Sequence, residues 1–160
     1  MRIHRFLLAA SVAATLAACA TQPAPVSVAD TISHTPQLST LNGLVQKAGL
    51  TEMLKTGGPM TVFAPTNDAF KAVPAKTMDE LAHDPAKLKA LISYHVLPSR
   101  MAAADVKNGN AKTANGAEIA LSRAGDFVTV EEAMVQTADI AATNGVVHTV
   151  DRVLMPPVRR

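Results

Sequence analysis

Apolar residues along the chain change their spacing in a way that predicts helices first and strands later. From Thr35 to Ala48 they recur at three- and four-residue steps, as on one face of an amphipathic helix. Thr35 is the expected N-cap of this helix, with Pro36 at its first position. One further helical turn is expected before Gly57-Gly58-Pro59, which breaks the pattern.

The next segments predict one strand followed by short helices. Met60 to Ala64 is a β-type run that ends at Pro65, and Thr66 is placed to cap a short helix. Thr77 and Glu80 have the spacing of a capping box, and Asp84-Pro85 is expected to open a further helix. The first two thirds of the chain are therefore predicted to be mainly helical.

After Pro98 the pattern becomes that of an antiparallel sheet. Asn108-Gly109, Asn115-Gly116 and Asn144-Gly145 are hairpin-type turn pairs, and alternating apolar runs lie between them. Helices that precede strands in this way predict an α+β domain, with N-terminal helices packed on a mainly antiparallel sheet. We expect one domain over residues 30–157 and a C-terminal tail at 158–160.

The start of the chain has the layout of a secretory signal. Two arginines and a histidine precede an apolar run from Phe6 to Leu16, which is too short for a permanent membrane span of about 20 residues. Leu16-Ala17-Ala18-Cys19 resembles a lipobox, which predicts a signal peptide over 1–18 and lipid on Cys19. The alternative is an ordinary signal peptide cut near an Ala-x-Ala, with Cys19 incidental.

Lipid on Cys19 would explain why an exported chain has this single thiol. Two or more acyl chains, at roughly 0.8 kcal/mol per CH₂, would hold the protein stably at a membrane. Residues 19–29 then form the lipidated N-terminus and a proline-containing spacer. Since Ala20 and not Asp follows Cys19, the resemblance to bacterial lipoproteins implies the outer membrane, facing the periplasm or the cell surface.

The charge balance argues against nucleic acid as a partner. The full chain has 15 basic and 13 acidic residues, but Arg2 and Arg5 leave with the signal, which makes 13 of each. Only 3% of the residues are aromatic. Neither phosphate neutralisation nor base stacking therefore has an obvious source.

Two segments resemble the signature blocks of the fasciclin-like domain family, and a pair of residues between them matches as well. Thr61 to Phe70, with the sequence TVFAPTNDAF, is similar to the first block, and Asn144 to Pro156 is similar to the closing block. Tyr94-His95 lies between them, as the central pair of the family does. Their order and spacing match over about residues 30–157, and the resemblance implies a fasciclin-like fold.

The same resemblance implies interaction residues. Tyr94 and His95 match a pair implicated in adhesion, and Asp139-Ile140 is similar to the core of a second adhesion motif, although Thr137 and Ala138 depart from the residues that precede it in animal members. From the residues alone, all four side chains could equally serve folding. His148, on a strand face with Val146 and Val150, is expected to be a hydrogen-bonded core histidine.

No sequence pattern points to catalysis. The chain lacks the usual hydrolase, thiol-redox, zinc, dinucleotide and P-loop motifs, so we expect neither an enzyme nor a cofactor. The histidines are not at helical ligand spacing, so no metal site is expected. The adjacent carboxylates at Glu131-Glu132 are interpreted as solvated surface.

The leading hypothesis is a membrane-tethered protein that makes contact with an envelope or extracellular protein or polysaccharide. The alternative is a periplasmic carrier or sensor of a small ligand, which the low aromatic content disfavours because ligand pockets are often lined by aromatic residues.

Overall fold

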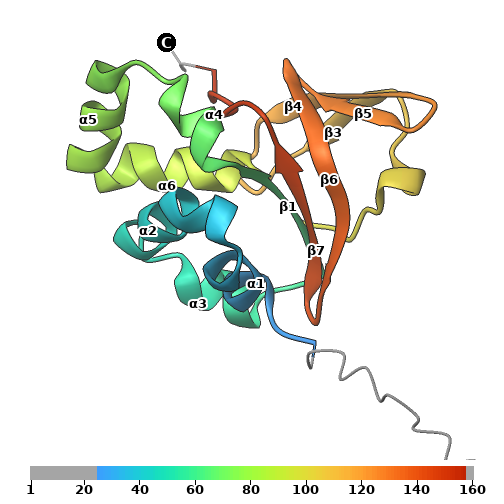
Figure 1. Cartoon of the computed structure of the whole chain (residues 1–160), viewed down its shortest axis with the longest axis horizontal. Coiled ribbons are helices and arrows are strands. Elements are labelled where there is room, and N and C mark those ends of the chain that lie inside the picture. The colour runs from blue at the N-terminus through green and yellow to red at the C-terminus, as the bar shows by residue number, and fades with distance from the viewer. Residues whose placement is uncertain (1–24, 158–160) are drawn as a thin grey trace, which may run out of the picture.

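The computed structural model describes residues 25–157, which are coloured in Figure 1. The predicted signal peptide at 1–18, Cys19 and the tail at 158–160 lie outside these residues. None of the helices described between residues 25 and 157 has the length and apolar character needed to span a bilayer.

Helices occupy the first part of the chain and strands the second. The helices are α1 (Val28–His34), α2 (Ser39–Lys47), α3 (Thr51–Thr56), α4 (Asn67–Lys71), α5 (Ala75–His83) and α6 (Pro85–Tyr94), with 3₁₀ turns η1 (Pro36–Leu38) and η2 (Ala103–Asp105). The strands are β1 (Met60–Pro65), β2 (Val96–Leu97), β3 (Gly109–Lys112), β4 (Glu118–Ala124), β5 (Phe127–Val130), β6 (Ala133–Ala142) and β7 (Gly145–Val150).

The strands form one sheet in the order β2-β1-β7-β6-β5-β4-β3. Every neighbouring pair is antiparallel except β1 and β7, which run parallel. The helices gather on one side of β1 and β7, and the β3–β6 strands curl over the other side (Figure 1). The predicted α+β class with a mainly antiparallel sheet is confirmed.

The folded part begins two residues before the predicted boundary at residue 30. The Ser27 hydroxyl accepts a hydrogen bond from the Asp30 N–H at 3.2 Å and donates one to the Asp30 carboxylate at 2.7 Å. The Ser27 side chain thereby caps α1, whose Val28 and Ile32 side chains are fully buried. The Ser-x-x-Asp spacing was the available sequence signal, but the prolines nearby suggested a spacer.

Of two further predicted helix starts, one is right in position but lacks its capping bond, and the other is wrong. Thr35 ends α1 and precedes Pro36 at the start of η1, which leads directly into α2, but its hydroxyl donates back to the Thr31 carbonyl at 2.7 Å and makes no capping bond to η1. Thr77 lies inside α5, which starts directly after Pro74, so no capping box forms there. A threonine hydroxyl that bonds to the preceding turn illustrates how local side-chain bonds can replace a cap.

Other predicted caps and turns are confirmed. Thr66 caps α4 and Asp84 caps α6 through their side-chain oxygens. Asn144-Gly145 joins β6 to β7, and Asn115-Gly116 lies between β3 and β4. Asn108-Gly109 is not a hairpin turn, however, because it leads from η2 into β3.

Two apolar cores lie on opposite faces of β1 and β7. One packs the helices against Val62 and Val147, and the other packs the β3–β6 strands against Phe63 and Val150. All six residues of β7 are buried as a result. The side chains of β1 and β7 are therefore packed on both faces of the sheet.

Candidate functional site

The Tyr94-His95 pair lies where α6 ends and β2 begins, and the histidine is an interior residue. His95 is 2% exposed. Its Nδ1–H donates to the Leu91 carbonyl at 2.8 Å, and its Nε2 accepts from the Leu154 N–H at 2.9 Å. This pattern fixes the neutral tautomer. Burial lowers the pKa of His95 to about 4, against a weaker opposing effect of the Leu91 carbonyl.

Tyr94 is buried as well, but its hydroxyl reaches the edge of a cleft. The residue is 3% exposed, and the hydroxyl donates to the Glu118 carbonyl at 3.3 Å. Burial, and next the negative charge of Glu131, raise the pKa of the Tyr94 phenol. The phenol therefore stays protonated and remains a hydrogen-bond donor at neutral pH.

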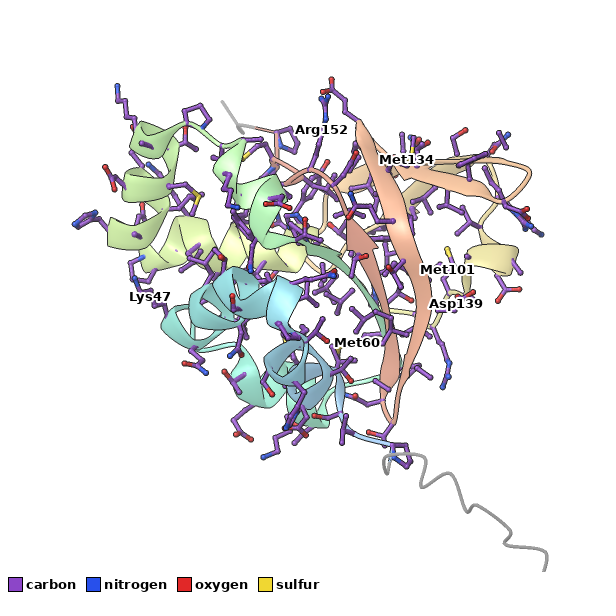
Figure 2. The ribbon with its side chains drawn as sticks, in the orientation of Figure 1. Lys47, Met60, Met101, Met134, Asp139 and Arg152 are labelled. Carbon is purple, nitrogen blue, oxygen red and sulfur yellow. The ribbon has the colours of Figure 1, made fainter. Side chains whose placement is uncertain are left out.

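The cleft beside Tyr94 has a volume of about 290 Å³. It is lined by the β5–β6 turn and the segment after β7: Tyr94, Glu131, Glu132, Ala133, Arg152, Val153, Leu154 and Met155. Arg152 and Glu132 form an ion pair at 3.6 Å, with side chains 62% and 89% exposed. The Arg152 side chain stands at the top of the molecule in Figure 2. The cleft thus offers charges of both signs to a polar partner.

Glu131 and Glu132 share this rim but have different roles. The Glu131 carboxylate accepts the Ala120 N–H at 2.7 Å, so it helps to hold the β5–β6 turn. Its backbone is left-handed, with φ at 54°. Glu132 is exposed and forms an ion pair with Arg152. Its position is consistent with the solvated surface that was predicted for Glu131-Glu132.

Asp139 sits in an irregular stretch of β6 with φ at 58°. Its carboxylate, 51% exposed, accepts the Ala103 N–H at 2.7 Å, and its own N–H donates to Nδ1 of His148 at 3.0 Å. The irregular stretch of β6 is therefore hydrogen-bonded both to η2, through Ala103, and to β7, through His148.

His148 is confirmed as a hydrogen-bonded core histidine. Its Nε2–H donates to the Met101 carbonyl at 2.8 Å, and Nδ1 accepts from the Asp139 N–H. The ring stacks on Phe63, with centroids 5.6 Å apart. Both ring nitrogens are used by the backbone, and the residue is 1% exposed.

Ile140 is half-buried against the helical core, away from the Asp139 carboxylate. It lines a separate cleft of about 500 Å³ between α1 and β6, with Pro25, Val26, Thr31, His34, Thr35 and Ala141. Strands β1 and β7 lie between β2, which follows Tyr94-His95, and β6, which carries Asp139-Ile140. The four predicted interaction residues therefore do not form one surface.

Two asparagines of the signature blocks have roles that sequence reasoning missed. The Asn67 side chain accepts from the Thr40 N–H at 3.0 Å and donates to the Pro36 carbonyl at 3.1 Å, so it joins α4 to η1 and α2. The Asn144 side chain donates to the Leu54 and Gly57 carbonyls and accepts from the Val28 N–H. Their place in the signature blocks was the sequence signal for both, and Asn144 was also visible as part of a turn pair.

No cluster of three or more His, Cys, Asp or Glu side chains suited to a metal ion occurs within residues 25–157. The side chains at the Tyr94 cleft can donate and accept hydrogen bonds and pair with charges, which is the chemistry of contact.

Comparison with known proteins identifies the family. The fasciclin domain model matches residues 36–156. The chain belongs to the fasciclin domain family. Protein sll1483 of Synechocystis sp. is 38% identical over 135 residues, which cover 83% of this chain and 75% of that protein. Cell surface glycolipoprotein MPB83 of Mycobacterium bovis is 34% identical over 137 residues, which cover 82% of this chain and 61% of that protein.

A solved structure supports the fold. A fasciclin domain pair from the insect cell adhesion molecule Fasciclin I matches with a TM-score of 0.62 and 22% identity, over 76% of this chain and 46% of that one. Proteins with this domain are generally non-catalytic and related to adhesion. The resemblance that the signature blocks indicated is thus confirmed, and so is the fold it implied.

Proposed function

We propose that this protein is a lipid-anchored protein of the cell envelope whose fasciclin domain mediates adhesion by contact with a protein or polysaccharide, without catalysis. Membership of an adhesion-related family is the observation that carries the proposal. The signal-like segment and Leu16-Ala17-Ala18-Cys19 support export and a lipid on Cys19. The relative named a cell surface glycolipoprotein supports the same location.

The contact surface we propose is the rim of the Tyr94 cleft. The side chains of Tyr94 and His95 are engaged inside the domain, so they cannot be the groups that first meet a partner. Glu132 and Arg152 flank the same cleft and are well exposed. In this proposal the buried pair positions the rim, and the exposed pair makes the contact through charge and hydrogen bonds.

Attachment of whole cells tests this assignment. A deletion strain would be complemented with the wild type or with a variant that carries Glu132→Ala and Arg152→Ala. The control carries Asp68→Ala and Lys71→Ala, which removes another exposed ion pair, at 2.8 Å, that belongs to α4 and does not line the Tyr94 cleft. We expect the control to restore attachment and the cleft variant to fail. Full attachment by the cleft variant at equal protein level would show that the rim is not the contact surface.

The lipid anchor has its own test. Replacement of Cys19 by Ala removes the only thiol of the chain and with it the site of acylation. We expect the wild type in the membrane fraction and the variant outside it. A variant that stays with the membrane would contradict the anchor.

A small-ligand carrier is less well supported. The rim of the cleft beside Tyr94 is charged, unlike the mainly apolar lining that is common for ligand pockets. No side-chain nitrogen or oxygen of the described residues is buried without a hydrogen-bond partner, so none of these buried side chains has an unused polar atom for a ligand.

A further inference from the structure

Residues 26–28 are hydrogen-bonded to the β6–β7 turn. The Thr143 N–H donates to the Val26 carbonyl at 2.9 Å, and the Val28 N–H donates to the Asn144 side chain at 2.9 Å. The same Asn144 side chain donates to the Leu54 carbonyl and, at 2.6 Å, to the Gly57 carbonyl. Residues 26–28, the β6–β7 turn at Thr143-Asn144 and the C-terminal end of α3 are therefore joined at one end of the domain. We call this end, with its hydrogen bonds through Asn144, the tether end.

The chain between this end and the lipid site is short. Pro25 follows Cys19 by six residues. A fully extended chain spans at most about 3.6 Å per residue, which makes a reach of about 20 Å. A lipidated Cys19 would thus keep the tether end close to the bilayer, whereas a longer linker would let the domain turn freely.

The tether end also exposes apolar side chains. Val26 is 38% exposed and Met53, on α3, is 36% exposed, two of the large apolar side chains that the described residues leave at the surface. The mainly aliphatic cleft that contains Ile140 opens beside Val26. Exposed apolar side chains are stabilised when they are buried at the boundary between lipid headgroups and acyl chains, because they are removed from water there.

On the basis of the proposed lipid anchor, we propose that the tether end of the domain docks on the bilayer surface and that the Tyr94 cleft points away from it. Strand β6 connects the two ends: it starts beside the cleft at Ala133 and reaches the tether end at Ala142. Its 10 residues, at about 3.3 Å each, separate the ends by roughly 30 Å.

Figure 1 shows the arrangement, with the β6–β7 turn and the entering chain at the bottom and the C-terminal segment at the top. Arg152 and Met134 are labelled at the top of the same view in Figure 2. The docked domain therefore presents its charged rim to molecules beyond the membrane, and the lipid surface covers Val26 and Met53.

Site-specific fluorescence tests the orientation. Because Cys19 is the only cysteine, its acylation leaves the domain free of other thiols, so one introduced cysteine carries one fluorophore. The full lipidated protein would be reconstituted in vesicles of phosphatidylethanolamine and phosphatidylglycerol that contain a headgroup nitroxide quencher. Labels at Thr56→Cys and Thr143→Cys report the tether end, and a label at Glu132→Cys reports the far end; all three positions are exposed.

We expect several-fold stronger quenching at positions 56 and 143 than at 132. Equal quenching at the three positions, or the strongest at 132, would overturn the orientation while the anchor stands. Failure of the protein to float with the vesicles would instead overturn the anchor, and this proposal with it.

A second variant tests the role of the apolar surface. Val26→Asp combined with Met53→Asp should lower the quenching at position 143 at least two-fold. The control is Phe127→Asp, which removes a 66% exposed apolar side chain from the start of β5 and should leave the quenching unchanged. The same loss in both variants would contradict docking through the tether end.

Discussion

The interior beneath the Tyr94 cleft and the rim above it hold polar side chains in opposite surroundings. Beneath the cleft, both nitrogens of His95 bond to backbone groups, and the ring is 2% exposed. At the rim, Glu132 and Arg152 pair with each other across 3.6 Å and are more than half exposed. The comparison teaches that the central pair Tyr94-His95 holds the fold, whereas the charged side chains at the rim, of which Arg152 lies in the closing block, are free for contact.

The largest expected effect is the loss of the buried ring. His95→Ala removes two hydrogen bonds, leaves the Leu91 carbonyl and the Leu154 N–H without partners, and opens a cavity. We expect the free energy of unfolding to fall by about 3 kcal/mol or more in urea titrations. His83→Ala, at an exposed position, is the control and should change stability by less than about 0.5 kcal/mol. Equal effects would contradict the structural role of His95.

Acid should weaken the domain through the same residue. The pKa of His95 is about 4 in the folded chain, below the unfolded value near 6.5, because burial disfavours the charged ring. The unfolded chain therefore takes up the proton first as the pH falls. The stability from this group is complete above about pH 6.5, lower by about 2 kcal/mol at pH 5, and lost towards pH 4.

Urea titrations at pH 7.5 and pH 5 measure this loss. His95→Gln keeps a donor and an acceptor but does not titrate, so its stability should differ less between the two pH values than that of the wild type. The same difference in both proteins would assign the pH effect to other groups.

A smaller effect is expected at Asp139, which is half exposed but still bonded to the backbone. Asp139→Ala removes the acceptor of the Ala103 N–H and places alanine at a φ of 58°, so unfolding should become easier by about 1 kcal/mol. Asp139→Asn retains an acceptor and tolerates this backbone, and it should lose less than half as much. A loss as large in the Asn variant would mean that the charge matters, and not the hydrogen bond.

The smallest effect on stability is expected at the rim. Loss of the exposed Glu132 and Arg152 pair by double alanine substitution should change the free energy of unfolding by less than about 0.5 kcal/mol. Thermal and urea unfolding measure it. A marked loss of stability would show that the rim pair, like the interior, supports the fold. Loss of attachment by this variant would then no longer be evidence of contact.

Much of the fold could be predicted because local chemistry and tertiary packing agree. The capping residues Thr66 and Asp84 act within three residues of their own position, so their roles were visible in the sequence. Thr35 lies at the predicted start, but its hydroxyl bonds to the preceding turn and makes no capping bond to the next one, which its place before a proline did not reveal. The start of α1 at Val28 lies before the predicted boundary, where the Val28 N–H bonds to Asn144, more than a hundred positions away, and the Val28 side chain is buried.

The candidate site was harder to predict. Tyr94 and His95 were visible through the family resemblance, but the same motif is compatible with packing and with contact. Arg152 and Glu132 come together only because the segment after β7 passes the β5–β6 turn, and no local pattern marks such a meeting. Asn144 was visible as a turn residue, while its bonds to α1 and α3 were not.

The sequence by itself determined the α+β class, the family and the positions of most helices and turns, because these depend on spacing, caps and short motifs. Only the tertiary structure decided which motif residues are inside and which meet at the surface. Exposure is a property of the packed chain. His148 is buried because β7 is covered on both faces, and His95 is buried where the end of α6 meets the segment after β7, whereas Glu132 and Arg152 remain exposed at the rim of the cleft.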